Sequence, residues 1–111
     1  MNPVDLVQRQ FEAYNARDLD RFCAQYAADI EVFRPPAAAP ALAGMAAFRA
    51  FYASERFIHA GLHAQLLGRL VLGRTVIDHE RIHGVRAEPY EIAVVYEVEG
   101  GLIRRTWTHA A

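Results

Sequence analysis

The sequence contains no lysine. All twelve of its basic residues are arginine, against thirteen aspartate and glutamate residues. The formal net charge is −1 with histidine neutral, and no basic cluster stands out, so nucleic acid is not an expected partner. The sequence also lacks a glycine-rich phosphate loop and a serine-nucleophile motif, which argues against the enzyme classes that depend on them.

Cysteine and long apolar runs are equally scarce. The single cysteine, Cys23, excludes an internal disulfide, and its apolar helical pattern indicates a buried free thiol in a reducing compartment. The N-terminal stretch MNPVDLVQRQ has no apolar signal core, and no run approaches the roughly 20 residues of a membrane span. We therefore expect a cytoplasmic protein without membrane association.

The 111 residues, 53% hydrophobic and 23% charged, predict one folded domain over residues 1–111. Apolar residues at helical spacing, beginning with Val4, Val7, Phe11 and Tyr14, predict a first helix. Pro35 and Pro36 should end the first strand, because proline cannot donate to a sheet ladder. In this half we expect helices over 3–16, 18–27 and 45–57, a strand over 29–34, and a loop over 35–43.

The second half alternates apolar and polar residues, which is typical of strands. We expect four long strands over 63–72, 75–83, 90–98 and 102–109, with Gly73 and Arg74 as a two-residue turn. Helices followed by an antiparallel meander indicate an α+β fold. A strongly curved antiparallel sheet would wrap the three N-terminal helices and leave a cone-shaped cavity.

Three segments carry a family resemblance: FEAYNARDLDRFCAQYAADIEVF, the AxxGMAAFRAFYAS pattern, and YEVEGGLIRRTW. In this order they resemble the nuclear transport factor 2-like superfamily, whose cystatin-like α+β roll includes ketosteroid isomerases, limonene epoxide hydrolase and SnoaL-like polyketide cyclases. The resemblance covers nearly the whole chain. It implies the cone fold, a cavity for a small apolar or amphipathic ligand, no cofactor, and a homodimer formed through the outer face of the sheet.

Most catalytic residues of the ketosteroid isomerases do not transfer to this sequence. Gln10 or Phe11 stands where those enzymes place a tyrosine, and Arg34 stands in place of their catalytic base. Val94 or Ala93 replaces the aspartic acid of their oxyanion hole, whereas Tyr52 matches a pocket tyrosine. An arginine cannot abstract a proton, and neither Val94 nor Ala93 has a side-chain donor. The sequence therefore predicts that this is not a ketosteroid isomerase.

The segment TVIDHERIH, residues 75–83, places four ionisable residues beside the predicted core. If Gly73 and Arg74 form the turn, Arg69 lies opposite Asp78, and Glu80 projects from the same face. Arg69 would hold Asp78 as a carboxylate, whereas a desolvated Glu80 would have a raised pKa. Two carboxyl groups in different states suit general acid/base chemistry, so Asp78, Glu80 and Arg69 are the candidate catalytic residues.

Two alternatives stay open at this point. A register shift of one residue would bring His79 and Arg81 inside instead, as an alternative polar site. The Arg69–Asp78 pair is also compatible with a purely structural role. No metal site is expected, because histidines four residues apart on a strand are separated by roughly 13 Å. The candidate ligand-binding residues, chosen as core residues that would also reach the cone, are Tyr14, Tyr26, Phe33, Tyr52, Val94, Tyr96 and Trp107.

Two hypotheses about function follow. The first is a small-molecule-binding protein with an apolar pocket and cofactor-independent acid/base chemistry of the isomerase, cyclase, dehydratase or hydrolase type. The alternative is a non-catalytic dimer that sequesters a ligand or serves a structural role. Burial of Asp78 or Glu80 in a closed cavity with a shifted pKa favours the first hypothesis.

Overall fold

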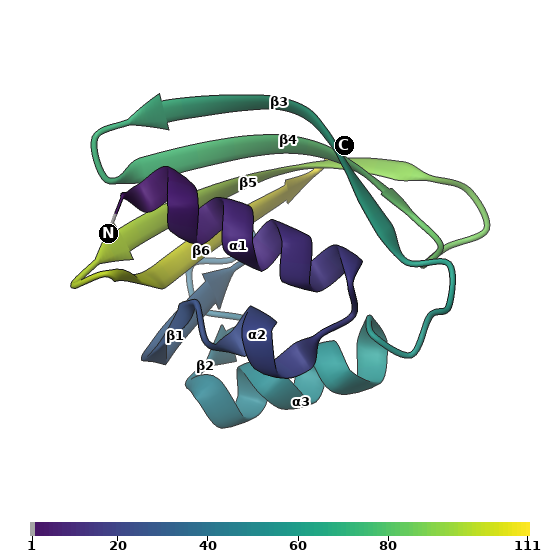
Figure 1. Ribbon diagram of the computed structural model, residues 1–111, viewed down its shortest axis with the longest axis horizontal. Helices are drawn as coiled ribbons and strands as arrows, with labels where there is room; N and C mark the ends of the chain where they lie inside the picture. Colours follow the sequence, from purple (N-terminus) through teal and green to yellow (C-terminus); the bar gives the residue numbers. More distant parts are fainter. Residues whose placement is uncertain (1) are drawn as a thin grey trace.

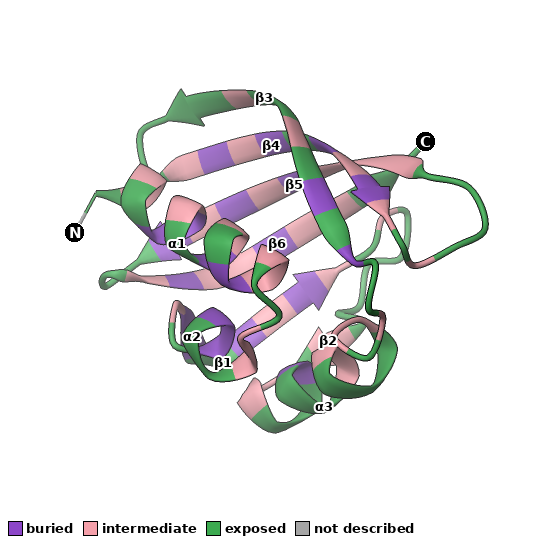
Figure 2. Cartoon of the chain, turned by 45° about the vertical axis from the view of Figure 1, so that its right-hand side comes forward, coloured by how far each residue is buried: buried purple, intermediate pink, exposed green. Residues whose placement is uncertain are grey.

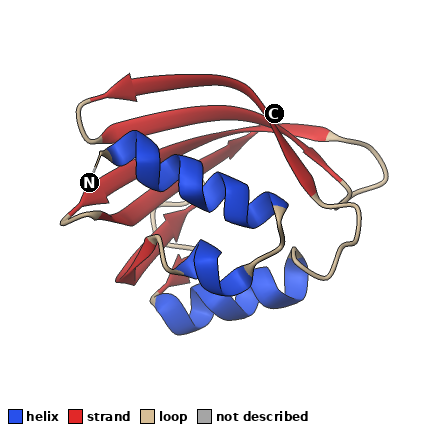
Figure 3. Ribbon diagram, viewed as in Figure 1, coloured by secondary structure: helices blue, strands red, loops and turns tan. Residues whose placement is uncertain are grey.

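The computed structural model describes residues 2–111, which form three helices packed on one face of a six-stranded sheet (Figure 1). Figure 3 shows the helices lying together on one side, with the long strands curving over them. No helix in the described part is long and apolar enough to cross a bilayer. The helices are α1 (Pro3–Asn15), α2 (Leu19–Cys23) and α3 (Met45–Glu55), and the strands are β1 (Tyr26–Phe33), β2 (Leu42–Ala43), β3 (His63–Leu72), β4 (Thr75–His83), β5 (Tyr90–Glu99) and β6 (Leu102–Ala110).

Helix α1 begins as the sequence predicts. The Asn2 side chain accepts a hydrogen bond from the backbone N–H of Val4 at 2.9 Å, and Pro3 occupies the first turn. The buried face of the helix holds Leu6, Val7, Gln10 and Ala13. A glutamine on this face is unusual, because a buried amide needs hydrogen-bond partners.

The sheet has the strand order β2-β1-β6-β5-β4-β3, and its neighbours are antiparallel except for β1 and β6, which run parallel. The parallel pairing also shortens the second helix. We expected that helix to continue to residue 27, but α2 ends at Cys23 and β1 already begins at Tyr26. The Gln25 carbonyl accepts a hydrogen bond from the Ile103 N–H at 2.9 Å, so pairing with a distant strand overrides the local helical pattern.

The predicted loop over residues 35–43 contains the short strand β2 at its end. The Ala41 N–H donates to the Val32 carbonyl at 2.7 Å, and the Gly44 N–H donates to the Ile30 carbonyl at 2.8 Å. These bonds return the chain along β1 and direct it into α3.

The register of β3 and β4 agrees with the prediction near the turn and changes further away. Leu72 pairs with Thr75 and Arg69 with Asp78, as expected. Between Leu66 and Gly68 the register shifts by one residue, so Leu66 pairs with Glu80. A bulge of this kind bends the strand and increases its twist, which helps the sheet curve around the helices.

The core lies between the helices and the inner, concave face of the sheet. Figure 2 shows buried positions alternating with half-buried ones along β4 and β5, as expected for strands with one face against helices. Phe22 of α2 and Phe48 of α3 stack with ring centroids 5.6 Å apart, and each is about 1% exposed. Burial of such a side chain stabilises the fold by about 1.5–3 kcal/mol.

Candidate functional site

The helices do not fill the cone completely, and a cavity of about 350 Å³ remains inside it. This volume is at the small end of the range for small-molecule sites, roughly 300–1,000 Å³. Its buried end is formed by α1, β4 and β5, and its open end lies near α3, the end of β1 and the loop after β4. The polar residues of its lining are Gln10, Tyr14, Tyr26, Arg34, Tyr52, Arg56, Glu80, Arg86, Tyr90, Tyr96, Thr106 and Thr108.

Glu80 is the carboxylic acid of this lining, and it is 5% exposed. Within residues 2–111 no hydrogen bond or ion pair holds its side chain, and no fully buried side-chain oxygen or nitrogen lacks a partner. The Glu80 oxygens must therefore be open to the cavity. Desolvation, reinforced by the charge of Asp78 and opposed by Arg69, raises the pKa of Glu80 to about 8. Near neutral pH, Glu80 is mostly protonated.

Asp78 lies one pleat away on the same inner face of β4 but has a different environment. It is 0% exposed, and both of its oxygens accept from Arg69, with Nε to Oδ1 at 2.7 Å and Nη2 to Oδ2 at 2.9 Å. Arg69 also donates to Gln8 of α1 at 2.8 Å. These hydrogen bonds tie β3 and β4 to α1. Neither Asp78 nor Arg69 lines the cavity.

A second polar network lies at the buried end of the cavity. Gln10 donates to the Val7 carbonyl at 3.0 Å, which fixes the orientation of its amide because a carbonyl can only accept. In that orientation Gln10 donates to the Tyr96 hydroxyl at 3.1 Å and accepts from the Tyr26 hydroxyl at 2.9 Å. Tyr26 has thus used its proton, whereas no residue in the described chain accepts the proton of Tyr96. The Tyr96 hydroxyl remains able to donate to a ligand.

The tyrosines around this end are neutral at physiological pH. Burial, with a contribution from the Glu80 charge, raises the pKa of Tyr96 well above its ordinary value, and burial does the same for Tyr26 and Tyr14. Burial raises the pKa of Tyr52 to about 12, although Arg56 and Arg34 act in the opposite direction. These hydroxyls can offer hydrogen bonds but not negative charge.

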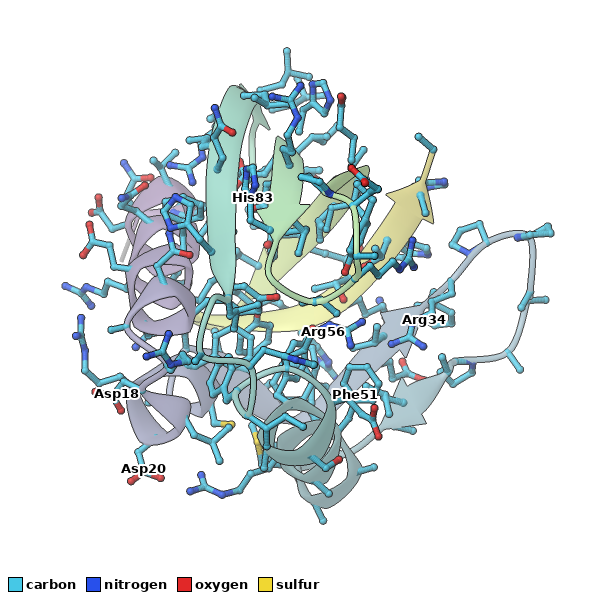
Figure 4. The ribbon with its side chains drawn as sticks, turned by 90° about the vertical axis from the view of Figure 1, so that its right-hand side faces the viewer. Asp18, Asp20, Arg34, Phe51, Arg56 and His83 are labelled. Atoms are coloured by element: carbon cyan, nitrogen blue, oxygen red, sulfur yellow. The ribbon has the colours of Figure 1, made fainter. Side chains whose placement is uncertain are left out.

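Arginines surround the open end of the cavity. The guanidinium carbon of Arg34 lies 4.9 Å from the centre of the Phe51 ring, and that of Arg56 lies 5.0 Å from it. Figure 4 shows these three side chains together at the end of the molecule that faces the viewer. On the loop after β4, Arg86 stacks over Tyr90 at 3.8 Å. All five residues line the cavity.

Some of the candidate site residues from the sequence line the cavity, and others do not. The cavity lining includes Glu80, Tyr14, Tyr26, Tyr52, Val94 and Tyr96. Phe33 and Trp107 do not line it, because their neighbours Val32 and Thr106 face inward and side chains alternate along a strand. These two rings stack on each other, 5.5 Å apart, on the outer face. Phe33 and Trp107, which the sequence nominated as ligand-binding residues, therefore lie outside the lining of this cavity.

His79 and Arg81, the alternative polar site, also lie on the outer face of β4. His79 contacts Glu91 at 2.6 Å and Arg81 contacts the same carboxylate at 3.2 Å. Their side chains are half exposed and absent from the cone lining. The register in which Asp78 and Glu80 share the inner face is the one observed.

Sequence reasoning missed Gln10, Arg34, Arg56 and Arg86 as parts of one site. Gln10 gave a usable signal, because it falls at helical spacing from the buried Leu6 and Ala13. The three arginines gave none, since they come from separate segments and meet only through the fold. Within residues 2–111, no three histidine, cysteine, aspartate or glutamate side chains are grouped in a way that could hold a metal ion.

Comparisons with known proteins agree with this architecture. The sequence pattern of the SnoaL-like domain matches residues 7–106. A candidate ketosteroid isomerase from Kribbella flavida superposes with a TM-score of 0.84 at 20% identity, covering 98% of this chain and 77% of that one. A candidate polyketide cyclase from Sinorhizobium meliloti gives 0.80 at 19% identity, covering 97% and 99%.

A third solved structure, an NTF2-like protein of unknown function from Cytophaga hutchinsonii, gives a TM-score of 0.83 at 13% identity over 100% of this chain and 91% of that one. No curated protein sequence matches the chain. At these identities the structural likeness demonstrates the fold, an NTF2- or cystatin-like α+β roll, and leaves activity to the site itself.

Proposed function

The chain belongs to the SnoaL-like domain family, and we propose that it binds a small amphipathic molecule inside the cone and transfers a proton to or from it through Glu80. The observation that carries this proposal is a carboxylic acid that is 5% exposed, has no partner within the described chain, and opens onto a cavity. A buried polar group without a partner costs stability, so its presence at a cavity wall favours a functional role.

The chemistry follows from the protonation state of Glu80. A catalytic acid or base works best when its pKa is near the working pH, and burial raises that of Glu80 to about 8. The protonated form can donate to a ligand, and the carboxylate form can remove a proton from a carbon acid. The Tyr96 hydroxyl, which accepts from Gln10 and has its own proton free, can stabilise the charge that develops on the ligand.

Glu80 is the only member of the nominated trio that this proposal uses for chemistry. Asp78 is occupied by two hydrogen bonds from Arg69, and the pair lies outside the cavity lining. Its contacts favour a structural role, so the catalytic trio expected from the sequence reduces to Glu80 supported by Tyr96. Isomerisation, cyclisation, dehydration and hydrolysis all require such a proton transfer.

A test independent of the natural substrate uses a nitrobenzisoxazole, a small apolar carbon acid. Loss of its proton opens the ring and releases a coloured phenolate, so a buried base of the kind proposed should accelerate the reaction. We expect the rate to rise with pH and to level off above about pH 8, the pKa of Glu80. Glu80→Gln should reduce the rate to that of the solution reaction.

Glu91→Gln is the matched control, because Glu91 is half exposed on the outer face of the sheet. It should leave the rate and its pH profile unchanged. A Glu80→Gln variant with full activity would contradict the proposal. Calorimetric binding of the probe without any turnover would instead support the non-catalytic, ligand-sequestering alternative.

A further inference from the structure

Three arginines at the open end of the cavity, Arg34, Arg56 and Arg86, have no carboxylate within ion-pair distance among the described residues. Elsewhere the protein pairs many of its arginines. Those with a carboxylate partner are Arg49, Arg69, Arg81, Arg104 and Arg105. No carboxylate of the described residues therefore forms an ion pair with the positive charge at the opening.

Aromatic rings hold these arginines without neutralising them. Arg34 and Arg56 both lie against the Phe51 ring, at 4.9 and 5.0 Å, and Arg86 lies against Tyr90 at 3.8 Å. Arg56 uses one nitrogen, Nη1, to donate to the Glu55 carbonyl at 3.0 Å. Stacking on a ring leaves the remaining guanidinium N–H groups available to an oxyanion, and the planar fork matches carboxylate and phosphate geometry. Bringing Arg34 and Arg56 to the same ring costs repulsion, which a bound anion would relieve.

The positive field extends into the cavity. Arg56 and Arg34 both favour the ionised form of Tyr52, against the burial that raises its pKa. The opposite end of the cavity is lined by buried groups such as Val94, Tyr96 and Gln10. The cavity thus has one cationic, accessible end and one enclosed end, where apolar side chains such as Val94 surround the Gln10–Tyr96 pair.

We propose that Arg34, Arg56 and Arg86 form an oxyanion-binding mouth, and that the ligand of the cone is a small organic anion whose charged group stays at the mouth while its apolar body enters toward Glu80. This inference rests on the proposed function for the claim that a small molecule enters the cone, and it adds the chemical class of that molecule. The anionic group is a carboxylate or a phosphate ester, both of which suit the arginine fork.

The test compares three probes with the same apolar body by isothermal titration calorimetry: naphthoate, the neutral naphthamide, and naphthyl phosphate. We expect one of the anions to bind at least about tenfold more tightly than the amide, as hydrogen bonds to charged groups imply. The anion that binds more tightly shows whether the charged group of the ligand is a carboxylate or a phosphate ester. Binding of that anion should weaken as salt is raised, because the mouth is exposed to solvent.

Substitutions test whether the preference for an anionic probe depends on the arginines at the mouth. Arg34→Gln and Arg56→Gln should each weaken binding of the preferred anion by about fivefold or more, and leave the affinity for naphthamide unchanged. Arg21→Gln is a matched control, because Arg21 is exposed on α2 and absent from the cavity lining. It should alter neither affinity.

The outcomes distinguish failure of the oxyanion mouth from failure of the proposed ligand binding and proton transfer in the cone. Equal binding of anions and amide, unaffected by the Arg34 and Arg56 substitutions, would overturn the oxyanion mouth while leaving a ligand-binding cone in place. Failure of all three probes to bind, together with no Glu80-dependent turnover of the nitrobenzisoxazole, would overturn both.

Discussion

Asp78 and Glu80 lie one pleat apart on the same buried face of β4, yet only Asp78 has an ion-pair partner among the described residues. Arg69 satisfies both oxygens of Asp78, whereas Glu80 faces the cavity and has a pKa of about 8. Two carboxyl groups that are adjacent on one face of a strand thus have different environments, one held in an ion pair and one open to the cavity.

The raised pKa of Glu80 predicts how stability depends on pH. In the folded protein Glu80 keeps its proton up to about pH 8, whereas in the unfolded chain the same carboxyl group loses its proton near pH 4.5. Unfolding between these values releases a proton, so the contribution of Glu80 to stability falls as pH rises from about 4.5 to 8. The loss is on the order of 5 kcal/mol, at about 1.4 kcal/mol per pKa unit.

Urea unfolding of wild type and Glu80→Gln, measured from pH 5 to pH 9, tests this prediction. The variant should be the more stable protein at pH 9, and the difference should shrink toward pH 5. A constant difference between the two proteins across this range would show that Glu80 is not buried as an acid.

Breaking the Arg69–Asp78 pair should destabilise the fold without a direct effect on the cavity. Asp78→Ala leaves Arg69, whose side chain is 15% exposed, without its charge partner, and should cost about 3–5 kcal/mol. Replacing both residues by leucine should cost markedly less, because no charge is then left unpaired. Chemical denaturation of Arg69→Leu, Asp78→Leu and the double leucine variant measures the coupling, and additive losses would contradict it.

The Gln10 network distinguishes two buried tyrosines. Tyr26 donates its proton to Gln10, whereas Tyr96 accepts from Gln10 and keeps its proton free. Each Tyr→Phe substitution should cost about 1–2 kcal/mol of stability by leaving a Gln10 group unpaired. Only Tyr96→Phe should also slow turnover of the nitrobenzisoxazole. Equal functional losses in both variants would show that the free proton of Tyr96 has no role.

The outer face of the sheet carries a row of directly paired apolar residues that crosses five strands. Register places Phe33 beside Trp107, Trp107 beside Val95, Val95 beside Ile77, and Ile77 beside Leu70. These side chains are half-buried or exposed, and charged pairs such as Arg81–Glu91 and Arg105–Glu97 flank them. We propose that a second copy of the chain covers this row.

Light scattering after size exclusion should therefore give the mass of a dimer for the wild type. Trp107→Arg should shift the population toward the monomer, because it places a charge in the middle of the apolar row. Binding of the anionic probe should persist in that variant, since Trp107 does not line the cavity. A monomeric wild-type protein would contradict the proposal.

Several features of the site were accessible from residue order. Gly73 and Arg74 between two alternating segments gave the turn, and the turn placed Arg69 opposite Asp78, as the pairing confirms. Apolar alternation along residues 90–98 placed Val94 and Tyr96 on the buried face. Both inferences depend on spacing within one hairpin or one strand, where geometry follows directly from the period of two.

The interactions between distant segments were not accessible in this way. The parallel pairing with β6 turned residues 26 and 27 from expected helix into strand, and the inward placement of Val32 and Thr106 moved Phe33 and Trp107 out of the cone. The bulge near Leu67 likewise depends on how β3 curves around α1.

The sequence by itself determined the order of the helices and of the long strands, the fold class, and the two carboxyl groups on one face of β4, because these follow from local periodicity and turn chemistry. Only the tertiary structure decided which carboxyl group is paired and which is open to the cavity. It also brought Arg34, Arg56 and Arg86 to one opening. Burial and charge proximity depend on contacts between segments far apart in the chain, and they set the chemistry of this site.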